Sequence, residues 1–192
     1  MAADTETPIM SFPSASDWEQ WLAENQRSEC GIWMQLAKKG SGIVTVTYDE
    51  ALDVALCYGW IDGQKKSQDA DYFLQKFTPR RSKSLWSKRN VTKALQLIES
   101  GRMQAAGLAE VELAREDGRW EAAYDAQRDM VVPEDFLLAV RQDEQVEAFF
   151  ATLNKTNLFA IAWRLQTAKT PETRARRFAV LLEMLGKGEK FH

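Results

Sequence analysis

Residues 47–64, TYDEALDVALCYGWIDGQ, place a capped helix directly before a glycine and a strand-like segment. Thr47 and Glu50 have the spacing of a capping box. Apolar residues of one helix face follow with helical spacing: Ala51, Val54, Ala55 and Tyr58. Gly59 ends this helix, because a glycine after the last periodic residue is a common helix stop. The stretch therefore predicts that helix and sheet alternate in this part of the chain.

The sequence on either side extends this mixed pattern. Upstream, a helix is expected from Ser16, which has capping-box spacing to Glu19, and a strand is expected within residues 31–37. The Gly-Ser-Gly turn at 40–42 leads to residues 43–46, which we interpret as the hairpin partner of that strand. Downstream, residues 71–77, DYFLQKF, predict a further strand that ends at Thr78-Pro79.

From Ser84 onward the pattern is helical almost throughout. The first of these helices carries an apolar stripe that is expected to face the core: Val91, Leu95 and Ile98. Further helices are expected near 104–116, 133–142, 144–153 and 156–168, and Thr170-Pro171 begins the last one. The predicted class is α+β, with a small mixed helix and antiparallel-sheet N-terminal part followed by a mainly helical C-terminal part. The predicted domains are a disordered tail at 1–8, an α+β domain at 9–128 and a helical C-terminal module at 131–192.

The composition is that of an ordinary folded protein. Of the 192 residues, 45% are hydrophobic and 28% are charged, which excludes disordered and fibrous classes. No window approaches the roughly 18 apolar residues of a membrane span, and the start MAADTETPIM lacks the features of a secretory signal. We therefore expect a cytoplasmic protein with no membrane span.

The number of histidines is the most informative feature of the composition, because the chain has a single histidine, His192, at its last position. This excludes His-based metal sites, Ser-His-Asp and Cys-His nucleophile systems and His acid/base pairs. Cys30 and Cys57 form no CxxC motif, and the sequence contains no nucleotide-binding loop or nucleophile elbow. The sequence accordingly indicates no metal and no cofactor, and it favours binding over catalysis.

Charge is unevenly distributed along the chain. Residues 1–64 carry 3 basic and 10 acidic side chains, whereas residues 65–89 carry 8 basic and 2 acidic ones. Within the basic part, residues 77–90, FTPRRSKSLWSKRN, place Arg80, Arg81, Ser84 and Ser87 around an expected helix start. Such a start can hold a phosphate or a carboxylate. Alternatively, the serines only cap the helix and the arginines pair with the acidic first segment.

The junction GWIDGQ suggests a second candidate feature. Trp60 and Asp62 could line a ligand cleft, and an enzyme would use Asp62 with Lys65, Arg80 or Tyr124 in a cleft lined by tryptophan and arginine. The simpler interpretation is that Asp62 caps a turn beside glycine.

Two further classes stay open. Basic residues interleaved with aromatic ones are typical of single-stranded nucleic-acid binding, but a sequence pI near 5.4 makes this role unlikely for the chain. The remaining class is a structural interaction module, for example a homodimer.

Five motifs, which occur along the chain in the same order as in a known family, carry a resemblance to that family: CYGWIDGQ, FTPRRSKSLWSKRN, ESGRMQAAG, DGRWEAAYD and TPETRARRFAVLLEMLGKGEK. With them the chain resembles the YdeI/OmpD-associated family, also described as bacteriocin-protection proteins, from about Phe12 to Lys190. The resemblance implies a helical module over roughly the last 60 residues and a stress-resistance role against bacteriocins or cationic antimicrobial peptides. It implies no catalytic residue.

Taken together, the sequence predicts that the protein binds an anionic small molecule or an acidic partner protein. The predicted ligand-binding residues are Trp60, Asp62, Arg80, Arg81, Trp86, Ser87, Asn90 and Tyr124.

Overall fold

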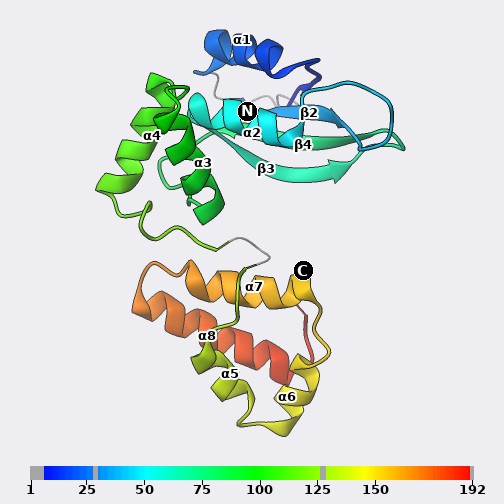
Figure 1. The fold of residues 1–192 in the computed structure, drawn as a ribbon. Coiled ribbons are helices and arrows are strands. Elements are labelled where there is room, and N and C mark those ends of the chain that lie inside the picture. The colour runs from blue at the N-terminus through cyan, green and yellow to red at the C-terminus, as the bar shows by residue number, and fades with distance from the viewer. Residues whose placement is uncertain (1–6, 28–29, 126–128, 191–192) are drawn as a thin grey trace, which may run out of the picture. The chain divides into compact units, whose positions relative to one another are not determined.

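The computed structural model describes residues 7–27, 30–125 and 129–190 (Figure 1). The chain forms two compact units, the first from residues 1–86 and 90–121 and the second from residues 87–89 and 122–192. The disordered tail predicted for residues 1–8 falls mostly on residues 1–6, outside the described part. The described residues form eight helices and one four-stranded sheet, which confirms the predicted α+β class.

The sheet of the first unit has the order β1-β2-β4-β3. Its strands are β1 (Ile9–Met10), β2 (Ile32–Ala37), β3 (Trp60–Ser67) and β4 (Tyr72–Pro79). The three longer strands are antiparallel, as predicted, and the two-residue β1 adds a parallel pair with β2. A register shift between Asp62 and Lys65 interrupts the pairing of β3 with β4.

The hairpin partner predicted at residues 43–46 is wrong, because these residues form no strand and β4 pairs with β2 instead. Two hydrogen bonds hold this segment as a loop. The Ala37 backbone N–H donates to Thr45 Oγ1 at 3.0 Å, and the Val46 N–H donates to the Phe12 carbonyl at 2.9 Å. The loop thus satisfies local donors without joining the sheet.

The first two helices are α1 (Ala15–Asn25) and α2 (Tyr48–Cys57). Helix α1 begins one residue before the predicted Ser16, because Ser14 is its N-cap and accepts from the Asp17 N–H. The capping box of Thr47 and Glu50 is present at the start of α2, as predicted. The aromatic side chains between α1 and the sheet form one cluster: Phe12, Trp18, Trp21, Trp60 and Phe77.

Helices α3 (Lys88–Glu99) and α4 (Ala105–Glu116) follow the sheet. The core stripe predicted for α3 is wrong at Leu95, which is 45% exposed, while Val91 and Ile98 are half-buried; the fully buried positions of α3 are Asn90, Ala94 and Leu97. Lys93, which lies beside the buried residues on α3, forms an ion pair with α2, with 2.6 Å between Lys93 Nζ and Asp53 Oδ1.

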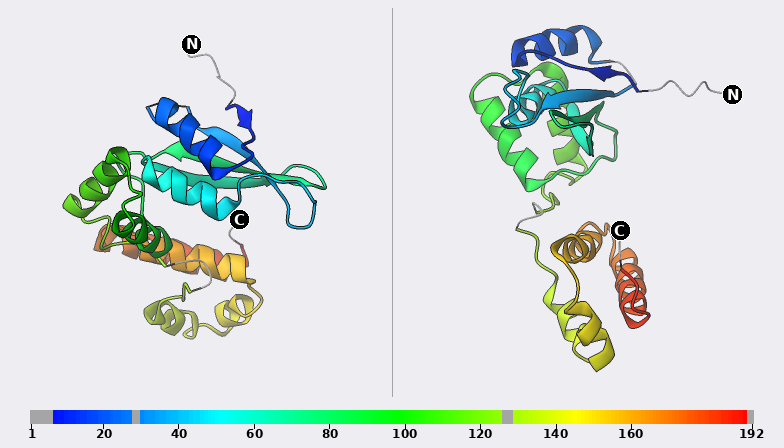
Figure 2. Two further views of the ribbon diagram at one scale, coloured as in Figure 1. Left: turned by 45° about the horizontal axis from the view of Figure 1, so that its top comes forward. Right: turned by 90° about the vertical axis from the view of Figure 1, so that its right-hand side faces the viewer.

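The second unit contains α5 (Glu134–Val140), α6 (Glu144–Phe150), α7 (Lys155–Gln166) and α8 (Pro171–Gly186), the yellow-green to red helices of Figure 2. Its core is built from buried side chains of all four helices, and the most deeply buried large ones come from α5, α7 and α8: Phe136, Ile161, Leu165, Leu181 and Leu185. Asp135 of α5 and Arg174 of α8 form two parallel hydrogen bonds of 2.7 and 2.9 Å. Every described helix of the chain is too short or too polar to cross a membrane.

Candidate functional site

A surface pocket of about 460 Å³ lies in the first unit, at the end of β4. Among the described residues that line it, four are basic and none is acidic. The lining residues are Thr7, Gln26, Arg27, Cys30, Gly31, Lys76, Thr78, Pro79, Arg80 and Arg81. The pocket therefore concentrates positive charge in a protein whose net charge is −3.

Strand geometry brings part of this charge together. Side chains alternate along a strand, so Lys76 and Thr78 lie on the same face of β4 and lead toward Arg80 just beyond its end. The Arg80 N–H donates to the Gly59 carbonyl at 2.9 Å, which extends the pairing of β4 beside β3. Lys76 Nζ also lies 5.5 Å from the ring centre of Trp33, its partner residue on β2.

Arg80 is the one pocket cation that is buried among the described lining residues, with 7% of its surface exposed. Its guanidinium carbon lies 3.6 Å above the ring of Trp86, and its Nη1 donates to the Leu85 carbonyl at 3.3 Å. The Trp86 ring is in turn held edge-on by Trp120, with 4.8 Å between the ring centres. Arg80 is thus fixed in place before any ligand arrives.

A buried carboxylate offsets the charge of Arg80. Burial raises the pKa of Glu110 on α4, while the guanidinium groups of Arg80 and Arg119 act in the opposite direction and favour its charged form. Arg119 is itself 6% exposed; its Nε lies 2.6 Å from Asp117 Oδ2. The ionised form of Glu110 therefore places a negative charge near the Arg80 guanidinium, whereas Arg119 is a second cation that Asp117 pairs with.

Arg81, in contrast, projects from a short turn and is exposed. Its backbone N–H donates to Ser84 Oγ at 3.0 Å, and the Ser84 N–H donates back to the Arg81 carbonyl at 2.8 Å. Ser84, one of the two serines expected at the helix start, thus closes the turn that carries Arg81. Arg81 can move toward a ligand, whereas Arg80 cannot.

Two further residues shape the opposite wall of the pocket. Trp60 is completely buried, and its Nε1 donates to the carbonyl of Gln26 at 3.1 Å, which fixes the chain next to Arg27. Gly31 lies so close to β4 that a Cβ on it would come within 2.5 Å of the Phe77 carbonyl oxygen. This wall is therefore built by close backbone packing, and residue 31 has no room for a side chain.

The other predicted site residues lie elsewhere. Asp62 accepts a hydrogen bond of 2.6 Å from the Tyr48 hydroxyl and does not line the pocket. Asn90 is buried near the start of α3. Ser87 and Tyr124 belong to the second unit, where they form an isolated β-bridge. The structure thus brings Arg80 and Arg81 together at the pocket, supports its walls with Trp60 and Trp86, and places the remaining four outside it.

Several pocket residues were missed by sequence reasoning. Lys76 had a usable signal, because residues 76, 78 and 80 alternate along a strand that ends in basic residues. Arg27 and Gln26 follow α1, some 50 residues before Arg80, and no local pattern links them to it. Glu110, which lies outside the pocket lining but near Arg80, was missed as well, because the charged residues of its helix look like an ordinary solvated face.

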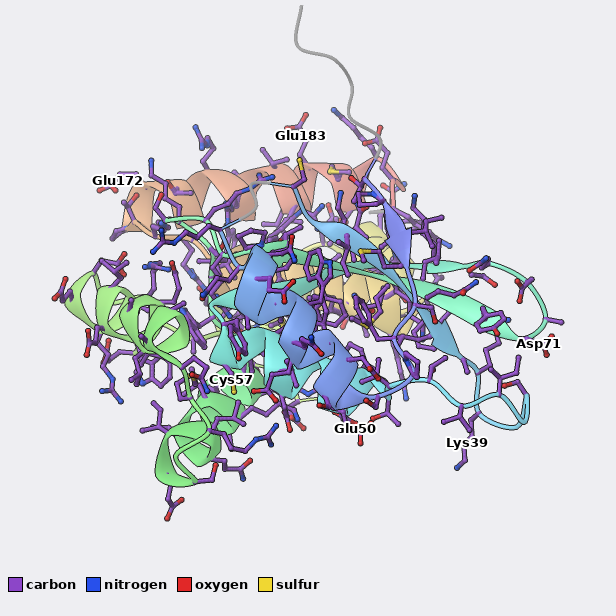
Figure 3. All side chains as sticks on the ribbon, turned by 90° about the horizontal axis from the view of Figure 1, so that it is seen from above. Lys39, Glu50, Cys57, Asp71, Glu172 and Glu183 are labelled. Atoms are coloured by element: carbon purple, nitrogen blue, oxygen red, sulfur yellow. The ribbon has the colours of Figure 1, made fainter. Side chains whose placement is uncertain are left out.

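The two cysteines differ sharply in environment. Cys57, labelled in Figure 3 at the end of α2, is buried, and this burial raises the pKa of its thiol to about 11. Cys30 is exposed and lines the pocket. Because the thiolate is the reactive form, Cys57 is chemically inert at neutral pH.

Comparisons with known proteins give two family matches. Residues 10–110, just over half of the chain, match the model of a domain of unknown function, DUF8412. Residues 129–188 match the model described as bacteriocin-protection, YdeI or OmpD-associated. This confirms the predicted resemblance for the C-terminal part and assigns the first part to a different model. No curated protein and no solved structure shows significant similarity to the chain. The chain therefore belongs to the DUF8412 family, and its C-terminal segment is similar to the YdeI/OmpD-associated family.

Proposed function

We propose that the first unit binds a small anionic molecule in the pocket at the end of β4. The observation that carries the proposal is the gathering of Arg27, Lys76, Arg80 and Arg81 around a cavity of about 460 Å³ with no acidic residue among the described lining. A volume in this range is typical of small-molecule sites. Like charges repel one another, so such a cluster is stabilised by a bound counter-charge.

The chemistry of the cations favours a phosphate or a carboxylate as the bound group. A guanidinium presents its N–H donors in a planar fork that matches the oxygens of either anion. Arg80 is buried and stacked on Trp86, so it contributes positive charge behind the pocket surface, and the exposed Arg27 and Arg81 supply the guanidinium donors that a ligand can reach. Thr78 and Gln26 add neutral hydrogen-bonding groups to the lining.

The C-terminal match supports a role in protection against bacteriocins, because protection is part of that family's description. We propose that ligand binding by the first unit serves this role and that the protein acts in the cytoplasm. Cells that express the wild-type chain would then survive a bacteriocin better than cells that express a variant with an impaired pocket. Equal survival of the two kinds of cells would show that ligand binding in the pocket has no part in protection against the bacteriocin.

Single-stranded nucleic acid is a weaker candidate ligand than a small anion. Base stacking requires an accessible aromatic face. In the first unit, Trp18, Trp33, Trp60, Trp86 and Trp120 are no more than 9% exposed. The enzyme alternative also lacks support at the pocket, because Asp62 is held by Tyr48 instead of lining it.

Isothermal titration calorimetry with inorganic phosphate, pyrophosphate and citrate tests the proposal on wild-type protein and on the variant Arg81→Ala. The matched control is Arg102→Ala, which removes another exposed arginine of the same unit that does not line the pocket. Loss of a charge-assisted hydrogen bond worth about 1.5–3 kcal/mol predicts at least tenfold weaker binding in Arg81→Ala. The control should bind as wild type.

Two results would overturn this function. One is that wild-type protein binds none of the three anions; the other is that Arg81→Ala and Arg102→Ala bind equally well. Near-UV circular dichroism of each variant checks that the aromatic cluster around Trp60 is intact. Since Arg81 is exposed, its replacement should leave the fold unchanged.

A further inference from the structure

A second hollow lies in the other unit, along helices α7 and α8, with a volume of about 300 Å³. Its described lining residues are Trp163, Arg164, Arg176, Arg177, Val180 and Leu181. Three of these six carry a positive charge and the other three are apolar. We call this hollow the α7–α8 groove; it falls within residues 129–188 and contains none of the predicted site residues.

The arginines of the groove are held to different degrees. Arg177 Nη1 donates to the Arg164 carbonyl at 2.7 Å and to Thr167 Oγ1 at 3.3 Å, which ties α8 to the end of α7. Arg164 Nη1 donates to the Ala160 carbonyl at 3.0 Å. The side chain of Arg176 is exposed and makes neither an ion pair nor a hydrogen bond with the described part of the chain. Its guanidinium is therefore available to an incoming acidic group.

The apolar part of the groove is also accessible. Val180 is 48% exposed although its neighbour Leu181 is almost completely buried in the core of the second unit. Trp163 is partly buried, and its ring lies edge-on to that of Tyr124 with 6.5 Å between the centres. An indole fixed in this way beside an exposed valine offers a rigid apolar contact.

Helical spacing places charge and apolar surface one turn apart. Arg176 and Val180 are separated by four residues, as are Arg177 and Leu181, so each arginine lies beside an apolar side chain about 5–6 Å away along α8. A ligand that uses both features needs an acidic group and an apolar group at the same separation. Side chains three or four residues apart on a peptide helix have this separation.

We infer that the α7–α8 groove docks an acidic peptide segment of a partner protein, with an apolar side chain against Trp163 and Val180 and carboxylates on the arginines. Charge complementarity selects this occupant, because the described lining contains three cations and no acidic group. Arginine clusters recognise acidic motifs, and amphipathic helices dock apolar residues in helix-lined grooves. This site is independent of the anion pocket in the first unit.

Fluorescence anisotropy of the full chain with labelled peptides tests the inference. The probe is a peptide of Glu and Leu, roughly 14 residues or four helical turns long, with both residues on one helix face. Two comparison peptides replace Glu by Gln or Leu by Ala. We expect the Glu/Leu peptide to bind at least about fivefold more tightly than either, because both halves of the groove contribute.

Variants of the chain locate the binding. Arg176→Ala and Val180→Ser should each weaken binding of the Glu/Leu peptide at least about fivefold, since both residues are exposed and contribute to the groove. The control Arg141→Ala removes an exposed arginine of the same unit outside the groove and should bind as wild type. Arg81→Ala should also bind as wild type, which separates this site from the anion pocket.

Any of four results would overturn the inference: no binding of the Glu/Leu peptide to wild-type protein, equal binding of the Gln/Leu peptide, equal binding to Arg176→Ala and wild type, or binding of decanoate in place of the peptide. The last would mark a site for a small amphiphilic anion. Sedimentation velocity without peptide measures self-association of wild-type protein and of Arg176→Ala. If self-association is absent, or is the same in both, a second copy of this chain is excluded as the occupant of the groove.

Discussion

Replacement of Gly107 by alanine tests the close packing of α4 against the end of α2. A Cβ at residue 107 would lie 2.5 Å from the Leu56 carbonyl oxygen and would also overlap the Cys57 carbonyl and Met103 Sδ. Favourable contacts between heavy atoms begin near about 3.5 Å. The N-terminal turn of α4 must therefore move by about 1 Å to accept the methyl group, because two of the three obstacles are backbone atoms of α2.

The expected cost follows from opposing effects. Alanine is preferred over glycine in helices by about 0.5–1 kcal/mol, which favours the variant. Overpacking of a close contact costs about 1–3 kcal/mol. Movement of α4 also weakens the 3.2 Å hydrogen bond from the Gln104 N–H to the Cys57 carbonyl, a bond worth about 1 kcal/mol. We expect a net loss of about 2 kcal/mol in the free energy of unfolding of the first unit.

Urea unfolding followed by tryptophan fluorescence measures this loss. Six of the seven tryptophans belong to the first unit, and Trp163 alone lies in the second, so the signal reports mainly on the unit that contains Gly107. Gly63→Ala is the matched control, because a Cβ there would meet Lys76 Cβ at an ordinary 3.7 Å. If Gly107→Ala is as stable as Gly63→Ala, the close approach of α4 to α2 is refuted.

Three further outcomes follow from local contacts. Thr47→Ala removes the capping box of α2 and should lower stability by about 1 kcal/mol, measured in the same urea assay. Cys30 should react with a thiol reagent at pH 8 while Cys57, with its pKa near 11, reacts only after unfolding; equal labelling of both in folded protein would contradict its burial. The hydrogen bonds from Arg174 hold the pKa of Asp135 below its usual 3.8, so their stabilisation is complete above that pH and is lost as pH falls through the lowered value. The stability difference between wild type and Arg174→Gln should accordingly shrink in acid, and a constant difference from pH 7 to pH 2 would count against the pair.

The helices and strands were largely predictable because their signals are local. The capping box at Thr47 and the cap at Thr170 act within four residues, and the strand pattern of β4 is read from its own side chains. The face that a helix buries depends instead on its partner. The apolar spacing of α3 favoured Leu95, but α3 buries Asn90, Ala94 and Leu97, a face that the spacing of its large apolar residues does not indicate.

The candidate site was predictable only where it is continuous in sequence. Arg80, Arg81 and Trp86 lie within seven residues and stood out as a basic and aromatic segment. Arg27 reaches the pocket through the packing of α1 on the sheet, and Glu110 reaches Arg80 through the packing of α4. Ser87 and Tyr124 show the reverse: Ser87 was grouped with the arginines because it lies in the same basic segment, and Tyr124 as a possible partner of Asp62, although both belong to the second unit.

The edges of the sheet have a consequence for the behaviour of the chain during refolding. One edge is β3, whose last five residues are exposed, whose pairing is interrupted beyond Asp62, and whose Lys65 and Lys66 extend over the rings of Phe73 and Trp33. The other is β1, only two residues long. Short, interrupted and lysine-bearing edges discourage the pairing of strands between molecules. Within the described residues, neither edge offers a long apolar template, so the protein should refold from denaturant at high concentration with little aggregation.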